Sequence, residues 1–511
     1  MKERGEKARR WRHRVPSGPL ALGGAAGIVL VLGTAGTTGA QEAAAAGVST
    51  EAKEGTFAAA RSVVLERTAE RLEALAAWCQ ERRLYAERDR LYERLIGLAP
   101  EHAQARRHLK YRKTREGWKR ERYRAPKNYG SEELGEVARR LTQLEQEYRE
   151  DLLALFERFD GEVGCEGGQR ILDDLLVVVP DDPEARERRG EVRLGPSGDW
   201  VLRETAVGRG RRALLASRAR EIVAGEIAVE SCAPAGEEAT LAWKAALAAD
   251  HLRLLATCDE REAAGILRRS EGAARVFALV FDEEPSLPRD YTVYVLACRG
   301  TKRRFLQAHP RVDAAVRAQS GRLDSVWIPS TSALAVWSTS EEMRADQVVR
   351  QTVQRMLADT YGIGSDHAWA YEGFGLYLCE LVTGSGDAVR NASSRQDAER
   401  WKKGLDLWEE ARGLVASGER PDLRALLTRG LDELSRAEVL LSYALARYLI
   451  EGNGDGVPRL LDDVGRSGRS AAHCLELSLG VEPELLEERL IRWILETSAI
   501  ADVDQPARVA G

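Results

Sequence analysis

Apolar residues at helical spacing dominate the pattern along this chain. Over residues 55–98, leucine and other apolar residues recur at intervals of three and four, which predicts helices that end before Pro100. A short helix is expected over Glu101–Leu109, and mainly helical structure over residues 213–270. From Ala345 onward, the same spacing predicts helices to the end of the chain.

Short runs with a different period interrupt the helical pattern in the C-terminal half. In these runs apolar and polar residues alternate, and Val, Phe and Tyr are frequent, as is typical of strands. The predicted strands are Arg275–Asp282, Tyr291–Ala297, Ser325–Pro329 and Ala333–Ser338. The expected fold class is therefore α+β and predominantly helical, with a small mixed sheet that is followed by a helical half.

Two segments of the N-terminal half share one pattern. Leu91–Pro100 and Ile171–Pro180 are apolar helical stretches that end at a proline. Each is followed by an acidic turn, a short stretch that ends in Ala-Arg, and a tryptophan, Trp118 or Trp200. The pattern resembles a tetratricopeptide-type hairpin with a small Trp-containing module, and it predicts a helical-repeat region that serves as a scaffold.

The first 40 residues differ from the rest of the chain. Residues 1–14 are strongly basic, Pro19–Leu32 is apolar, and small residues lead to Ala40. These are the three parts of a secretory signal peptide, so we expect export to the periplasm, the cell envelope or the extracellular space, with cleavage after Ala40. The alternative is an uncleaved membrane anchor formed by residues 19–36.

Composition narrows the choice of partners. The net charge is only −5, and the share of apolar residues, 44%, is typical of a soluble globular protein. Residues 106–127 contain eleven Lys or Arg together with three aromatic residues, but a solvated helical surface and linker is the favoured interpretation, and nucleic acid is not an expected partner. The seven cysteines form no CxxC pair and predict neither a metal knuckle nor a disulfide framework.

One pair of predicted helices carries the main functional argument. Val348–Tyr361 has a single apolar face, and a loop over Gly362–Asp366 separates it from a second helix that ends near Gly384. The second helix contains Trp369, Glu372, Gly373, Gly375 and Tyr377.

This pair resembles the active-site helices of the gluzincin, or peptidase MA-like, metallopeptidases. In that family the first helix carries HExxH and the second carries W-x-x-E-G-x-A-x-Y, whose Glu is the third zinc ligand. The tail from Tyr443 to Trp493 is similar to the closing helices of the family, so the resemblance covers residues 222–498. It implies that Ala333–Ser338 is the strand on the substrate side, and that Glu372 occupies the third-ligand position.

The resemblance fails where zinc chemistry would occur. Aligned on HExxH, the chain has Arg350 and Gln354 in place of the two histidines, and Gln351 in place of the glutamate. Arg350 has no lone pair to donate, Gln351 cannot accept a proton, and Gln354 is a poor zinc ligand. We therefore expect no catalytic residues, no metal and no cofactor, and we expect Arg350 to pair with Glu372.

Four other residues are candidates for the old substrate cleft. Trp369, Tyr377 and Tyr443 stand in or near the matching motifs, and His367 lies in the loop before the second helix. A role as a metal ligand is not expected for His367, because a lone histidine is more often a surface or capping residue. For Tyr443, packing is the favoured role.

Three weaker patterns have simpler explanations. Glu451–Asp462 departs from the EF-hand loop at several positions, and a glycine-rich helix connector explains it. Gly208–Ala213 fits GxGxxA but is expected to be a basic turn. His473 and Cys474 are neighbours in sequence, which is no evidence of a catalytic dyad.

These observations predict an exported peptidase-like protein that binds a peptide or protein partner or acts as an envelope scaffold. The alternatives are a divergent zinc metallopeptidase with other ligands and a purely structural envelope protein. The expected domains are a signal or anchor (1–40), two helical-repeat units (41–130 and 131–212), the helical and sheet part of the peptidase-like domain (213–345), its helical half (346–500) and a disordered tail (501–511).

Overall fold

The computed structural model describes most of the chain after residue 37. The described residues are 38–115, 117–124, 126–159, 164–194, 198–238, 241–319, 324–338, 340–384, 406–418 and 422–504. The predicted export signal falls almost wholly on residues 1–37, which lie outside them. Among the described residues, no helix combines the length and the apolar character needed to cross a membrane. The chain divides into two compact units, Met1–Thr56 and Phe57–Gly511, and all contacts below lie in the second.

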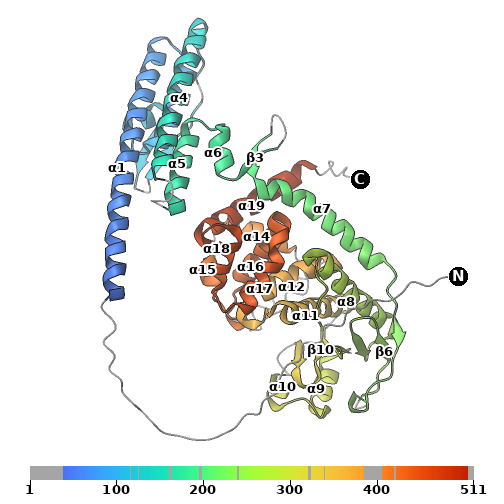
Figure 1. Ribbon diagram of the computed structural model, residues 1–511. Helices are drawn as coiled ribbons and strands as arrows, with labels where there is room; N and C mark the ends of the chain where they lie inside the picture. Colours follow the sequence, from blue (N-terminus) through green and yellow to red (C-terminus); the bar gives the residue numbers. More distant parts are fainter. Residues whose placement is uncertain are drawn as a thin grey trace, which may run out of the picture. The chain divides into compact units, whose positions relative to one another are not determined.

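Long amphipathic helices form the N-terminal part of this second unit. They are α1 (Thr38–Glu81), which begins in the first unit, α2 (Tyr85–Leu98), α4 (Leu134–Phe159) and α5 (Gly164–Val178) (Figure 1). Apolar residues at helical spacing, such as Leu144, Tyr148 and Leu152 of α4, point into one shared core. Arg61 on α1 donates two hydrogen bonds to Asp174 on α5, which ties the two helices together beside that core.

The two segments with a shared sequence pattern contain the same order of elements. After α2 come α3 (Ala103–His108) and an antiparallel pair, β1 (Tyr111–Thr114) and β2 (Gly117–Arg120). After α5 come α6 (Pro183–Arg188) and a second antiparallel pair, β3 (Glu191–Arg193) and β4 (Trp200–Leu202). The basic stretch that was expected to be a helical surface and linker is thus mainly a β-hairpin.

The two segments also share side-chain contacts. The indole N–H of Trp118 donates to Glu101 at 3.0 Å, and that of Trp200 donates to Asp181 at 3.0 Å. In both segments the acidic residue directly follows the proline that ends the longer helix. Each tryptophan therefore anchors its hairpin to the turn before the short helix.

A six-stranded mixed sheet follows the helix α7 (Arg203–Ala224). Its strand order is β5-β6-β7-β8-β10-β9, in which β8 is parallel to both β7 and β10, and the other pairs are antiparallel. The strands are β5 (Glu230–Ser231), β6 (Ala245–Ala248), β7 (Arg253–Ala256), β8 (Thr292–Leu296), β9 (Ser325–Ile328) and β10 (Ala333–Trp337). The helices of this part are η2 (Gly236–Glu238), α8 (Glu260–Phe281), α9 (Arg299–Ala308), α10 (Ala314–Gln319) and η3 (Pro329–Thr331).

Several sequence-based predictions in this region are wrong. Arg275–Asp282 is no strand but the last turns of α8, because its apolar run continues a helix that Asp259 caps at the start. Three strands lie within residues 213–270, where helix was expected. β10, which covers the predicted strand Ala333–Ser338, pairs with β8 at one edge and with β9 at the other.

Helices make up the remainder of the described chain. They pack around the largest apolar core, which takes in residues from α7 to α19. Their bounds are α11 (Glu341–Tyr361), η4 (Ser365–His367), α12 (Ala368–Thr383), α14 (Leu407–Ala416), α15 (Leu423–Leu426), η5 (Leu431–Glu433), α16 (Arg436–Tyr448), the π-helical η6 (Leu449–Asn453), η7 (Gly454–Gly456), α17 (Val457–Arg466), α18 (Ala471–Leu479) and α19 (Pro483–Asp504). The chain is thus mostly helical with a small mixed sheet. The tail expected to be disordered from residue 501 is still helical up to Asp504.

A histidine in the sheet region makes the stability of the fold depend on pH. The ring of His251, between β6 and β7, bonds to the carboxylate of Glu271 on α8, which is fully buried. This hydrogen bond raises the pKa of His251, with the charges of Asp250 and Glu284 adding to it, although burial acts in the opposite direction.

We predict that stability from this pair is lost at higher pH. A histidine whose pKa is raised by folding contributes its full stabilisation below its unfolded pKa of about 6.5, and loses it as the pH rises through the folded value. Replacing His251 by Gln should therefore destabilise the protein more at acidic than at alkaline pH. Urea unfolding of both proteins across this pH range measures the difference, and a gap that is independent of pH would contradict the prediction.

Candidate functional site

The helix that carries Arg350 has clear signals at both ends. Ser340 caps the start of α11, because its side chain accepts a hydrogen bond from the N–H of Met343 at 3.2 Å. At the other end Gly362 adopts a left-handed conformation with φ of 78°, and its N–H donates to the carbonyl of Ala358 at 3.0 Å. Glycine takes this conformation without strain, so α11 ends there.

The helix that carries Glu372, α12, is held very close to its neighbour α16. A Cβ atom added at Gly373 would lie 2.2 Å from the carbonyl oxygen of Ser442 on α16, which is closer than real atoms approach. The glycine in the W-x-x-E-G pattern is therefore required by the packing of two helix backbones. The other end of α12 is set by Gly384, which has φ of 70°.

Arg350 and Glu372 form the expected ion pair. Nη1 of Arg350 donates to Oε2 of Glu372 at 2.9 Å, from α11 to α12. The side chains are 1% and 2% exposed, so both charges are fully removed from water. A charge at such depth is tolerated only when an opposite charge and hydrogen bonds compensate for lost hydration. The pairing predicted from the sequence is thus confirmed.

Gln354 fills the space next to this pair. Its amide nitrogen donates to the carbonyl of Tyr371 at 3.3 Å, and its Cγ lies 2.9 Å from the position that a Cβ on Gly375 would take. Gly375 stands where the gluzincin pattern has alanine, and here the missing methyl group makes room for Gln354. Arg350 and Gln354, which are one helical turn apart, therefore both face α12. Gln351 is half-buried.

The aromatic candidates do not line an open cleft. Trp369, Tyr377 and Tyr443 are at most 1% exposed and belong to the largest apolar core. The packing role favoured for Tyr443 is confirmed, whereas Trp369 and Tyr377 do not lie on a cleft, because α12 and α16 pack directly together and the rings fill the interior. His367 is half-buried before α12, and no described residue accepts or donates a hydrogen bond at its buried Nδ1.

A second polar cluster lies beside this site and escaped the sequence analysis. The hydroxyl of Tyr377 donates to Glu451 at 3.0 Å, and the guanidinium of Arg447 donates to the same carboxylate at 3.0 Å. Tyr443 donates to Glu380, and Arg212 of α7 reaches both carboxylates, at 3.3 Å from Glu451 and 3.4 Å from Glu380. The only sequence signal for this cluster is the Arg447–Glu451 spacing of four residues inside an apolar helix.

This cluster is built for structure, because its charges are compensated and its hydroxyls stay protonated. Burial and the charge of Glu451 raise the pKa of Tyr377 well above its usual value. Burial and Glu380 do the same to the pKa of Tyr443. The guanidinium of Arg447 also stacks 3.7 Å from the centroid of the Trp408 ring. These contacts join α7, α12, α16 and η6.

Buried ion pairs of this kind recur in the second unit. Arg344 of α11 donates to Glu262 of α8 at 2.6 Å, and also to the carbonyl of Ser338 at 2.9 Å. The Arg447–Glu451 pair is equally buried, with side chains 2% and 1% exposed. The Arg350–Glu372 pair is therefore one of several that connect helices in the interior.

The weaker sequence patterns form no sites in the described structure. Glu451 is committed to the polar cluster, and the chain after it forms η6, η7 and α17, so it makes no EF-hand loop. Gly208–Ala213 lies inside α7, which makes the predicted basic turn wrong. Within the described residues, no group of three or more His, Cys, Asp or Glu side chains is arranged to hold a metal ion.

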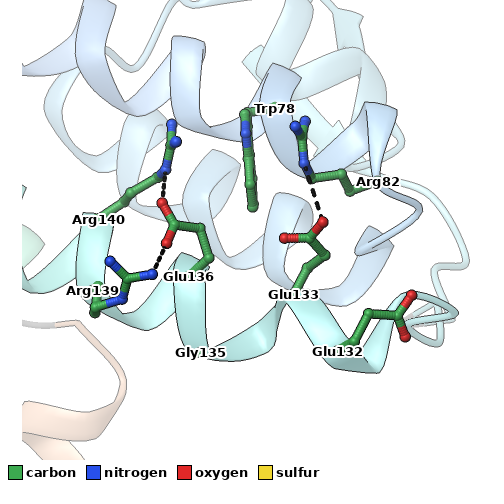
Figure 2. Close-up of a pocket in the computed structure, with 8 residues that line it drawn as sticks. All are labelled: Trp78, Arg82, Glu132, Glu133, Gly135, Glu136, Arg139 and Arg140. Atoms are coloured by element: carbon green, nitrogen blue, oxygen red, sulfur yellow. Dashed lines mark hydrogen bonds and ion pairs between the residues drawn. The ribbon is translucent and has the colours of Figure 1, made fainter.

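An open groove lies in the N-terminal helical region, away from the Arg350 site. It has a volume of about 560 Å³ and is lined by residues of α1, η1 and α4. Figure 2 shows the Trp78 ring between Arg82 and Arg140, whose Cζ atoms lie 4.2 Å and 4.8 Å from its centroid. A second hollow of about 360 Å³ shares Trp78 and Arg140 and continues along the two helices.

Comparison with known proteins gives no family match, no similar curated protein and no similar solved structure. The resemblance to the gluzincins therefore rests on the motif residues of the sequence.

We predict that Gly373→Ala strongly destabilises the protein. Its methyl group would overlap the carbonyl of Ser442 and push α12 away from α16, at a cost of about 3 kcal/mol or more, because backbone atoms cannot move aside as a side chain can. Gly413 in α14 is the matched control, since a Cβ there meets no atom within 4 Å. Gly413→Ala should stabilise by up to about 1 kcal/mol through helix propensity. Urea unfolding of both variants measures this, and equal effects would contradict the packing argument.

Proposed function

We propose that the C-terminal part is a peptidase-like domain without zinc catalysis, and that the protein acts by binding a peptide or protein in the cell envelope. The observation that carries this proposal is the buried Arg350–Glu372 pair. In a working gluzincin the carboxylate at this position would face a divalent cation. Here a guanidinium, which stays protonated at any working pH, supplies the positive charge.

The surrounding residues support the loss of catalysis at this position. A catalytic zinc needs three protein ligands and an open position for water, and the water needs a general base. Gln354 and Gln351 supply neither imidazole nor a proton acceptor, and Gln354 is packed into the space beside Gly375. The divergent-peptidase alternative would need ligands elsewhere, and the described residues offer no such cluster.

The open groove beside Trp78 favours a binding role over a purely structural one. The old active site is closed, because its polar and aromatic residues are buried. The groove, in contrast, presents a half-buried indole ring flanked by Arg82 and Arg140, together with paired charges such as Arg140–Glu136, on the surface of the helical region. We therefore place the peptide- or protein-binding surface there. Location in the envelope rests on the basic and apolar pattern of residues 1–40.

We predict that restoring the lost ligands creates a zinc site. The triple variant Arg350→His, Gln351→Glu, Gln354→His places two imidazoles one turn apart, facing Glu372. Gly375 leaves no side chain beside position 354. If the site keeps gluzincin geometry, the purified triple variant should contain about one zinc ion per chain, and elemental analysis measures this.

The control is the same triple variant with Glu372→Gln, which should lose most of its zinc. A triple variant that folds but binds no more zinc than the unaltered protein would contradict the gluzincin-like geometry. Stoichiometric zinc in the unaltered protein that disappears on Glu372→Gln would instead favour the divergent metallopeptidase.

A further inference from the structure

The first β-hairpin carries an unusual concentration of uncompensated positive charge. Eight Lys or Arg side chains on and around it are exposed, and none has an acidic partner among the residues that the structure describes. They are Arg107, Lys110, Arg112, Arg115, Lys119, Arg122, Arg124 and Lys127, which we call the basic hairpin surface. Arg120 and Lys113, in contrast, pair with Glu93 and Glu101.

The register of the hairpin separates its charges onto two faces. Lys113 lies opposite Trp118, and Tyr111 lies opposite Arg120, on the face that turns toward α3. Arg112 lies opposite Lys119 on the outer face. Two like charges directly across an antiparallel pair destabilise a sheet, so this pairing weakens the fold unless something outside it compensates.

The second hairpin provides an internal comparison. Trp200 pairs with Arg193 as Trp118 pairs with Lys113, so Val192 and Val201 take the positions of Arg112 and Lys119. There the corresponding face is apolar, and Val201 is only 5% exposed, so other parts of the chain cover it. The same module thus carries apolar residues where this face is buried. On the first hairpin no described element covers the outer face, and its charge indicates an anionic partner.

We propose that the basic hairpin surface binds an anionic lipid membrane. A membrane surface with anionic headgroups attracts clustered Lys and Arg without requiring a matching shape. The outer face has no apolar centre of the kind that protein interfaces bury, because Arg112 and Lys119 occupy it together with Thr114 and Gly117.

Single-stranded nucleic acid fits this surface less well, because its binding needs free aromatic rings for base stacking. The rings here are already in use. Arg106 lies 4.8 Å from the centroid of Tyr111 and 5.3 Å from that of Trp118, and the hydroxyl of Tyr123 bonds to Asp89. The outer face presents Arg112, Lys119, Thr114 and Gly117 and no aromatic ring.

The test uses the full chain with phosphatidylcholine vesicles that do or do not contain phosphatidylglycerol. The charge variant combines Arg112→Gln, Arg115→Gln, Lys119→Gln and Arg122→Gln. The matched control combines Lys244→Gln, Arg261→Gln, Arg268→Gln and Arg303→Gln, which removes the same charge from exposed residues elsewhere that also have no acidic partner in the described structure. Hydrogen exchange over residues 110–124 reports contact at the hairpin itself. Vesicle binding through the N-terminal residues alone would leave this exchange unchanged.

We expect anionic vesicles, and not neutral ones, to slow exchange in the hairpin of the unaltered protein and of the control. The charge variant should need at least about tenfold more anionic lipid for the same protection, and added salt should weaken the effect. Equal protection of the charge variant and the control would overturn the proposal. Protection of the hairpin by a double-stranded DNA fragment, but not by anionic vesicles, would also overturn the proposal.

Discussion

A buried carboxylate needs a positive charge beside it, and in this protein Arg350 meets that need for Glu372. The pair joins α11 to α12 at a depth where neither side chain reaches water. Its own net contribution to stability is small in principle, because the attraction mainly repays lost hydration. The pair strongly disfavours other packings of α11 against α12, because each buried charge is costly without the other. The pair therefore fixes which faces of α11 and α12 meet.

The rest of the helical half is arranged around this contact. Gln354 fills the space that Gly375 leaves, and Gly373 lets α12 approach the backbone of α16. The cluster around Glu451 then joins α16 and η6 to α7, which leads back to the second hairpin. The interior around this pair is closed, whereas the N-terminal part leaves the Trp78 groove open.

Much of this could be predicted from local sequence. The caps and glycines that bound α11 and α12, the strands over Thr292–Leu296 and Ala333–Trp337, and the Arg350–Glu372 pair follow from residue type and spacing. The wrong helix and strand predictions around the sheet share one cause, which is that short apolar runs suit strand and helix alike. Residues 275–282 are helical because Asp259 starts a long helix before them, and the short strands β5, β6 and β7 lie between better helix signals. The burial of Tyr377 and Tyr443 and the link from Arg212 to Glu451 depend on packing between distant segments, which spacing does not encode.

Arg350 and Glu372 act as one unit in the interior, because each buried charge stabilises the other. A double-mutant cycle with Arg350→Met, Glu372→Leu and both together, followed by urea unfolding, tests it most directly. Each single change removes one charge of the ion pair and leaves the other buried, which should cost about 3–5 kcal/mol, whereas the double variant should lose far less than the sum. Additive losses, with no coupling between the two positions, would contradict the account.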